Sequence, residues 1–149
     1  MSVRQITVRF PEIGYQRLSA LCVRHGVSIR GLFEAAAAVA FDDEAYPERR
    51  EAQLRIWEVI RLLEASAAYR EGPRHRISVE MDAQLADRFQ ADCFRFGVSM
   101  NAAFAGVVMP WPEDSGDDWR TYRRQNIHRV IERARQLDFT RRARSPLTV

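Results

Sequence analysis

Two short stretches of the chain alternate between apolar and polar residues, which is the pattern of a β-strand that buries one face. The apolar positions are Ile6, Val8 and Phe10 in the first stretch and Ile77, Val79 and Met81 in the second. The polar positions are Gln5, Thr7 and Arg9 in the first and Arg76, Ser78 and Glu80 in the second. The pattern predicts two strands, each with an apolar inner face and a polar outer face.

A first helix is predicted after each strand. Pro11 suits its first turn in the first half of the chain, and Asp82 suits the N-cap in the second half. Gly26 and Gly97 fit the left-handed position that ends such a helix. Each first helix is therefore expected to lie between its strand and this glycine.

Second and third helices are predicted further along each half. Ser28 and Ser99 suit the N-caps of the second helices. The third helices are expected from Pro47 to about Tyr69 and from about Asp117 to Leu137, after breaks at residues 42–47 and 110–116. Their apolar stripes are formed by Ile56, Val59, Ile60 and Leu63, and by Ile127, Val130 and Ile131.

The two halves repeat one pattern at a fixed offset of 71 residues. Residues 4–10 align with 75–81, and Gly26-Val-Ser aligns with Gly97-Val-Ser, without a gap. The same offset is extended into the third helices, where it pairs Ile56 with Ile127 and Ile60 with Ile131. The expected division is a first repeat with its third helix at 1–71, a second at 72–140, and a basic tail at 141–149.

This order of strand, helix, Gly-x-Ser turn and helix resembles the ribbon-helix-helix family of DNA-binding proteins, of the Arc and methionine-repressor type. The resemblance covers residues 4–40 and 75–109 and leaves out the third helices and the tail. In that family two chains pair their strands, whereas here one chain supplies both, as in the tandem TraY-like relaxosome proteins. The resemblance implies a mainly α fold with a two-stranded antiparallel β-ribbon. The fold would be a tandem pseudo-dimer in which each repeat is β-α-α plus a third helix, with Thr7 near Ser78.

The outer face of such a ribbon is a candidate surface for reading DNA bases. A two-stranded ribbon fits the major groove, where arginine can grip guanine, glutamine can grip adenine and glutamate can accept from cytosine. The candidate base-contacting residues are Gln5, Thr7, Arg9, Arg76, Ser78 and Glu80. Any half-buried strand also has a polar outer face, so a purely structural explanation stays open.

The start of each second helix is a candidate phosphate site, because free backbone N–H groups and the positive end of the helix dipole attract anions. The resemblance implies that these helix starts clamp DNA phosphates on either side of the ribbon. The candidate residues are Val27, Ser28, Ile29, Arg30, Val98, Ser99, Met100 and Asn101. The serines can serve as N-caps at the same time.

Charge is distributed unevenly along the chain. All 23 basic residues are arginine, and the net charge is +3. Counting arginines against acids gives +4 for residues 1–30, −4 for 31–71, zero for 72–101 and +3 for 102–149. The arginines of the last helix and tail either form a solvated face or add phosphate contacts, and the sequence leaves both explanations open.

The sequence shows no pattern typical of catalysis, cofactor binding or metal binding. No catalytic set or glycine-rich phosphate loop is recognisable, so neither an enzyme nor a cofactor is expected. Cys22 and His25 supply only two ligands, and Phe96 replaces the histidine in the second repeat, so no metal is expected. Cys22 and Cys93 are expected to pack in the core. No membrane contact and a cytoplasmic location are expected, since no apolar run reaches the roughly 18 residues of a membrane span.

The predicted function is sequence-specific binding of double-stranded DNA, as a transcriptional repressor or a plasmid or relaxosome accessory factor. The alternative is a protein-interaction module, antitoxin-like or an assembly protein, whose third helices bind a partner. Glu80 on the outer face and the acids within residues 42–51 favour this alternative. On the ribbon, Gln5 is expected to face Arg76 and Arg9 to face Glu80, which would make the outer face asymmetric.

The third helices are also expected to drive self-association into a homo-oligomer, a dimer of single-chain pseudo-dimers. Trp57, Trp119 and Tyr122 add large surfaces of the kind enriched at interfaces. The alternative is that the apolar stripes only complete the core of the monomer, because a chain of this size has little core to spare.

Overall fold

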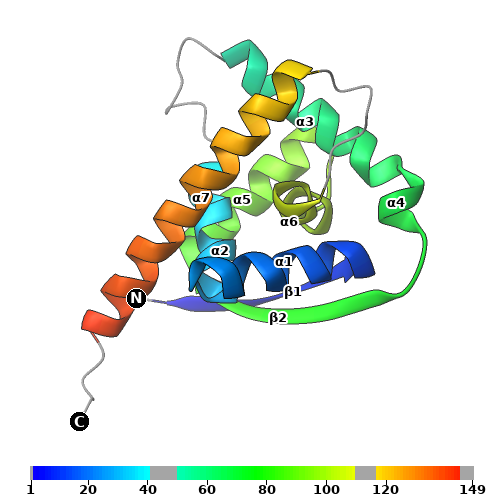
Figure 1. Cartoon of the computed structure of the whole chain (residues 1–149). Coiled ribbons are helices and arrows are strands. Elements are labelled where there is room, and N and C mark those ends of the chain that lie inside the picture. Colours follow the sequence, from blue (N-terminus) through cyan, green and yellow to red (C-terminus); the bar gives the residue numbers. More distant parts are fainter. Residues whose placement is uncertain (1, 41–49, 110–116, 145–149) are drawn as a thin grey trace.

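The chain is mainly helical, with a two-stranded antiparallel sheet along one side (Figure 1). The computed structural model describes residues 2–40, 50–109 and 117–144, without the side chains of residues 40, 50–55, 117–123 and 125. In chain order the elements are β1 (Val3–Pro11), α1 (Glu12–His25), α2 (Ile29–Ala35), the π-helix η1 (Ala36–Ala40), α3 (Arg50–Ala65), α4 (Ala67–Arg70), β2 (Arg74–Asp82), α5 (Ala83–Phe96), α6 (Met100–Val108) and α7 (Asp117–Ala143).

The two strands pair with each other within one chain, as predicted. The register runs from Val3 opposite Asp82 to Pro11 opposite Arg74, with Thr7 opposite Ser78 at the centre. The apolar positions predicted to face inward are all buried, with exposed fractions of 8% or less at Ile6, Val8, Phe10, Ile77, Val79 and Met81. Two strands alone are marginally stable, so the helices packed on this inner face hold the ribbon in place.

The ends of the first helices follow the predicted signals closely. The carboxylate of Asp82 caps α5 by accepting from the N–H of Leu85, at 3.0 Å. Gly26 and Gly97 end α1 and α5 with φ angles of 64° and 73°, in the left-handed region that favours glycine. Pro11 lies one position earlier than predicted, because its extended backbone makes it the N-cap rather than a residue of the first turn.

The third helices differ from the predicted segments in two ways. Ser66 interrupts the first one, where its hydroxyl accepts from the N–H of Tyr69 and starts the separate short helix α4. The second one, α7, continues past its predicted end at Leu137 to Ala143, so it includes the first residues of the predicted tail. The breaks predicted at 42–47 and 110–116 lie outside the described residues.

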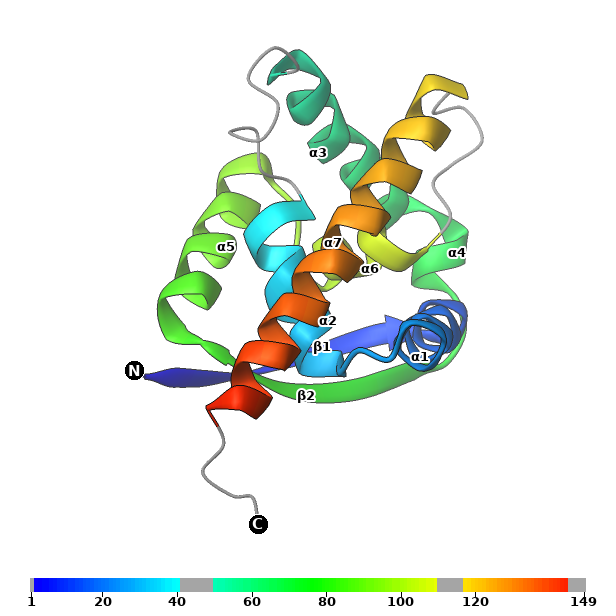
Figure 2. The ribbon, with the colours of Figure 1, turned by 60° about the vertical axis from the view of Figure 1, so that its left-hand side comes forward.

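Each third helix packs against the second helix of the other half of the chain. The last helix, α7, runs across α2 and η1, while α3 packs on α6 (Figure 2). Buried residues from both halves form one hydrophobic cluster that includes Phe33 of α2 and Phe104 of α6, whose rings meet edge to face at 4.7 Å. The two halves are therefore interlocked around a shared core.

The apolar stripes of the third helices complete this core. Ile56, Ile60 and Val130 have an exposed fraction of 0%, and Val59, Leu63 and Ile131 are also buried. Trp57 stacks on Phe96 of α5 with ring centroids 4.7 Å apart. The prediction that these stripes and Trp57 form a self-association interface is therefore wrong, because these side chains are buried inside the monomer. Ile127 is partly buried, and the side chains of Trp119 and Tyr122 lie outside the described residues.

Candidate nucleic-acid interface

The outer face of the ribbon carries six exposed polar side chains. They alternate with the buried positions of β1 and β2 and are Gln5, Thr7, Arg9, Arg76, Ser78 and Glu80. In Figure 2 most of the helices lie on the inner side of the ribbon, and α1 and the end of α7 lie at its level. All six residues proposed from the sequence to contact bases are thus brought together on one open face.

Pairing across the strands differs from the expected arrangement at both ends of this face. Thr7 and Ser78 form the centre, with their hydroxyl oxygens 3.3 Å apart. The register places Arg9 opposite Arg76 and Gln5 opposite Glu80. The expected pairs, Gln5 with Arg76 and Arg9 with Glu80, are wrong because antiparallel strands centred on Thr7 and Ser78 bring opposite ends of the two repeats together. The face is still asymmetric, with two arginines at one end and a carboxylate at the other.

Side chains from the first helices hold both ends of the ribbon. Arg4 forms an ion pair with Asp87 of α5 at 2.5 Å. At the opposite end, His75 hydrogen-bonds Glu12 of α1 at 2.7 Å. The hydrogen bond from His75 is the main reason why the pKa of Glu12 is lowered. These contacts fix the position of the ribbon relative to α1 and α5.

The second helices start as the sequence predicted. Ser28 Oγ accepts from the N–H of Gly31 at 2.8 Å, and Ser99 Oγ accepts from the N–H of Ala102 at 3.0 Å. These contacts confirm both serines as N-caps. The preceding valines, Val27 and Val98, are buried in the core at 6% and 7% exposure. Within the candidate phosphate sites, the valine side chains are therefore structural.

A carboxylate from a third helix already occupies each of these helix starts. Asp138 of α7 accepts from the backbone N–H of Ser28 at 2.7 Å and from its hydroxyl at 2.6 Å. In the second half, Glu64 of α3 accepts from the backbone N–H of Ser99 at 3.2 Å. The N–H groups of Ser28 and Ser99, which belong to the candidate phosphate sites, thus bind anions supplied by the chain itself.

An arginine accompanies each carboxylate one turn earlier in the same helix. Arg61 donates to the carbonyl oxygen of Phe96 at 2.9 Å, and Arg135 donates to that of His25 at 3.4 Å. Each third helix therefore binds both ends of the Gly-Val-Ser turn in the other half of the chain. The arginine contacts the last residue of the first helix there, and the acid contacts the N-cap serine of the second helix. We refer to the pairs Arg61/Glu64 and Arg135/Asp138 as the turn clips.

The turn clips show that the two third helices correspond at a different offset from the rest of the two halves. Arg61 matches Arg135 and Glu64 matches Asp138, which is an offset of 74 residues instead of 71. The same offset matches Ile56 with Val130, both fully buried. Extending the offset of 71 into the third helices was therefore wrong.

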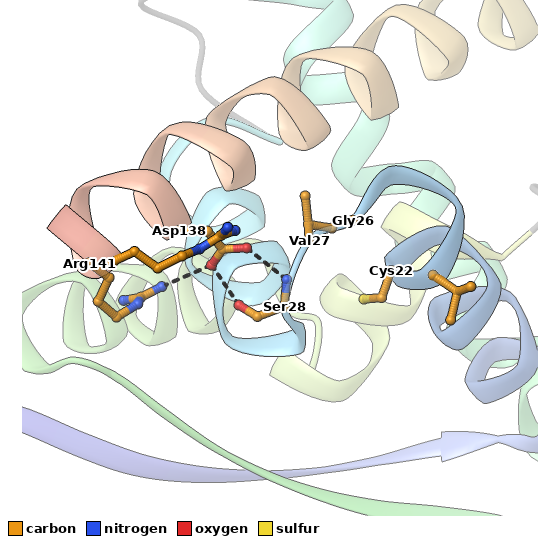
Figure 3. A pocket seen from close by; sticks show the side chains of 8 residues that line it. Cys22, Gly26, Val27, Ser28, Asp138 and Arg141 are labelled. Atoms are coloured by element: carbon orange, nitrogen blue, oxygen red, sulfur yellow. Dashed lines mark hydrogen bonds and ion pairs between the residues drawn. The ribbon is translucent and has the colours of Figure 1, made fainter. Parts of the chain in front are cut away.

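The environment of Asp138 favours its ionised form. Burial raises the pKa of this carboxyl, but the two hydrogen bonds from Ser28 and the charge of Arg141 outweigh that effect and leave the pKa below its ordinary value. Figure 3 shows Asp138 between Ser28 and Arg141. These residues line an open hollow of about 520 Å³, together with Cys22, Val23, Gly26, Val27 and Arg142.

A buried glutamate links α7 to the ribbon. Glu34 of α2, only 5% exposed, accepts from Arg30 at 3.0 Å and from Arg141 at 2.6 Å. Its other oxygen accepts from the backbone N–H of Asp82 at 3.3 Å. Arg30 also lies 3.7 Å from Glu80 on the outer face. Glu34 and Glu80 therefore both contact the guanidinium of Arg30, a candidate phosphate-contacting residue.

The second half has no such network at the matching positions. Asn101, which corresponds to Arg30, accepts from the backbone N–H of Arg9 at 3.2 Å. Ala105, which corresponds to Glu34, is an apolar residue of the core. No local sequence pattern signals the turn clips or the contacts of Glu34 with Asp82 and Arg141, because these partners are 35 to 110 residues apart in the chain.

Comparisons with known protein families, with curated proteins and with solved structures find no match to this chain. Within the described ranges, no helix has the length and apolarity needed to cross a membrane.

The two cysteines have different surroundings. Cys93 is buried at 2% exposure, as expected for a core residue, and burial raises its pKa to about 12. Cys22 is partly exposed beside the hollow of Figure 3, and burial raises its pKa as well. The described part of the chain contains no group of three or more histidine, cysteine, aspartate or glutamate side chains that could hold a metal ion.

Proposed function

We propose that the chain binds double-stranded DNA sequence-specifically, with the outer face of the β1–β2 ribbon in the major groove. In this proposal it is a ribbon-helix-helix protein whose two units are fused into one pseudo-dimer. Its role is that of a transcriptional repressor or of a plasmid or relaxosome accessory factor.

The observation that carries this proposal is the open face of the ribbon, and above all the pair Arg9 and Arg76. These residues lie directly opposite each other across the strands, where like charges repel. Among the described residues, neither guanidinium forms an ion pair with an acid. Two exposed arginines held side by side favour a polyanionic partner, which would relieve the repulsion, and their geometry suits contacts with guanine.

Phosphate contacts are proposed at the starts of α2 and α6, around Ile29 and Met100. The N-cap N–H groups of Ser28 and Ser99 can take part only if Asp138 and Glu64 release them. Arg30 can take part only at the expense of its contacts with Glu34 and Glu80. The candidate base-contacting residues are therefore exposed, whereas the N-cap N–H groups and Arg30 are already engaged within the chain.

A second function, a protein-interaction module, is favoured by this same occupation of the helix starts. If the turn clips are permanent, a carboxylate stands at each place where a phosphate should bind and repels it. The ribbon would then be a structural element, and the exposed surface would serve a protein partner. Antitoxin-like or assembly roles belong to this alternative.

A salt titration separates the two functions. Binding of the purified chain to a labelled random-sequence duplex of about 30 base pairs is measured by fluorescence anisotropy from 50 to 300 mM salt. DNA binding predicts an affinity that falls steeply and log-linearly with salt, because each phosphate contact releases a counterion. The protein-interaction function predicts no saturable binding at any of these concentrations.

Homo-oligomerisation is a separate part of the proposal. Two copies would lie on adjacent DNA sites and touch through surfaces other than the buried stripes of the third helices. Light scattering of the free and DNA-bound chain checks it, and a single copy in both states at high concentration would contradict it.

A further inference from the structure

The two third helices are equivalent up to their turn clips and differ beyond them. After Glu64, α3 ends at Ala65, whereas α7 continues after Asp138 to Ala143. At the offset of 74 residues, Arg141 and Arg142 correspond to Ala67 and Ala68. Only one half of the molecule therefore continues its third helix without a break. Arg141 and Arg142 make that continuation basic, whereas Arg144 has a counterpart in Arg70 of α4.

The extension is fixed next to one end of the ribbon. Arg141 binds Glu34, which also accepts from the backbone N–H of Asp82, the last residue of β2. Asp82 lies opposite Val3, so this end of the ribbon is the one where β1 begins. Figures 1 and 2 both show the C-terminal end of α7 at the level of the ribbon.

The residues beyond Arg141 are left open to solvent. Arg142 and Arg144 are exposed, whereas Arg141 is partly buried by its contacts with Glu34 and Asp138. Arginine in the last turn stabilises a helix by opposing the negative end of its dipole, and this alone could explain Arg142. It does not explain why the extension is anchored by a buried carboxylate beside the ribbon.

We propose that Arg142 and Arg144 bind the DNA phosphate backbone that flanks the ribbon, on the side of the β1 start only. This inference rests on the proposed function, since it assumes that the ribbon lies in the major groove. Guanidinium groups bind phosphate oxygens by charge-assisted hydrogen bonds that carry no sequence information. The footprint on DNA is then longer on the side where β1 begins than on the opposite side.

The test uses the full chain with Arg142→Ala and Arg144→Ala combined. The matched control combines Arg124→Ala and Arg133→Ala, two exposed arginines of the same helix that lie about 27 and 14 Å further from its end, at about 1.5 Å per residue. Circular dichroism establishes that both variants are folded. The readouts are the salt dependence of duplex binding and a hydroxyl-radical footprint on a preferred site.

The expected result is a salt slope reduced by about 1.8 for the end variant, because about 0.9 counterion is released per phosphate contact. Its footprint shortens on one side, and the control matches the wild type in both readouts. Arg142→Lys with Arg144→Lys keeps the charge and should restore the slope.

Two other results overturn the inference in distinguishable ways. Wild-type protein that binds duplex DNA while the end variant keeps the wild-type slope and footprint overturns this inference alone. Wild-type protein that binds no duplex overturns the proposed function and the inference with it.

Discussion

Asp138 is a buried acid that is held by three contacts within the candidate site. Its two oxygens accept from the N–H and the hydroxyl of Ser28, and Arg141 lies 3.5 Å away. The pKa of this carboxyl is lowered in the folded chain, so folding favours its ionised form. The contribution to stability is therefore fully present above the unfolded pKa, about 3.9, and is lost as pH falls through the lower folded value.

Asp138→Asn tests this contact. The variant keeps the shape of the side chain but replaces one accepting oxygen with a donor group that faces other donors. Urea unfolding at pH 7 should show a loss of about 1–2 kcal/mol in the free energy of unfolding. The difference from the wild type should shrink below about pH 3.9. Glu71→Gln, at an exposed acid outside the ribbon and the turn clips, is the control, and an Asp138→Asn deficit that stays constant with pH would contradict the assignment.

Residue-scale features could be predicted where their cause is local. Ser28, Ser99, Gly26 and Gly97 act within three or four positions of themselves, so their cap roles were readable from the sequence. The partner of Ser28, in contrast, is 110 residues away. Asp138 reaches Ser28 only because α7 crosses α2, and no local sequence pattern predicts that crossing.

Helix α6 packs against α3 at a glycine. A methyl group added at Gly106 would collide with Cδ1 of Ile60, and Leu63 lies close by. Ile60 is fully buried, so its side chain has little room to move. The close approach of these two helices therefore depends on the missing side chain at position 106.

Gly106→Ala should destabilise the fold despite the better helix propensity of alanine, with a net cost of about 1–3 kcal/mol. Ile60→Val removes Cδ1 and should cost about 0.5–1.5 kcal/mol alone. The two changes together should cost clearly less than their sum, because the second removes the atom that the first displaces. Thermal or urea unfolding of the three variants measures this, and strict additivity would argue against the packing.

The strands and the first helices could be predicted from their hydrophobic period. The role of the third helices could not, because it depends on which surface their apolar stripe packs against. The strands and the first helices have one apolar face each, and that face is the buried one. The stripe containing Ile60 and Ile131 is equally clear in the sequence, but its period does not say whether it faces the same chain or another one. The change of offset from 71 to 74 became visible only through the contacts of Arg61 and Arg135.

The molecule as a whole presents one ribbon whose two strands differ in sequence. Two identical chains must show the same residues twice and favour a palindromic half-site. This chain shows Arg9 with Arg76 at one end and Gln5 with Glu80 at the other. The Glu34 network and the extension of α7 occur in one half only, so the asymmetry extends beyond the ribbon.

The central claim is that this outer face reads DNA sequence, and selection of bound duplexes from a random pool tests it most directly. The wild type should enrich one motif without internal two-fold symmetry under the ribbon. Arg9→Ala and Arg76→Ala should each weaken binding to that motif by about 1–3 kcal/mol and relax the preference at one position. No enriched motif, a strict palindrome under a single ribbon, or arginine variants that lose affinity equally on all sequences would contradict the claim.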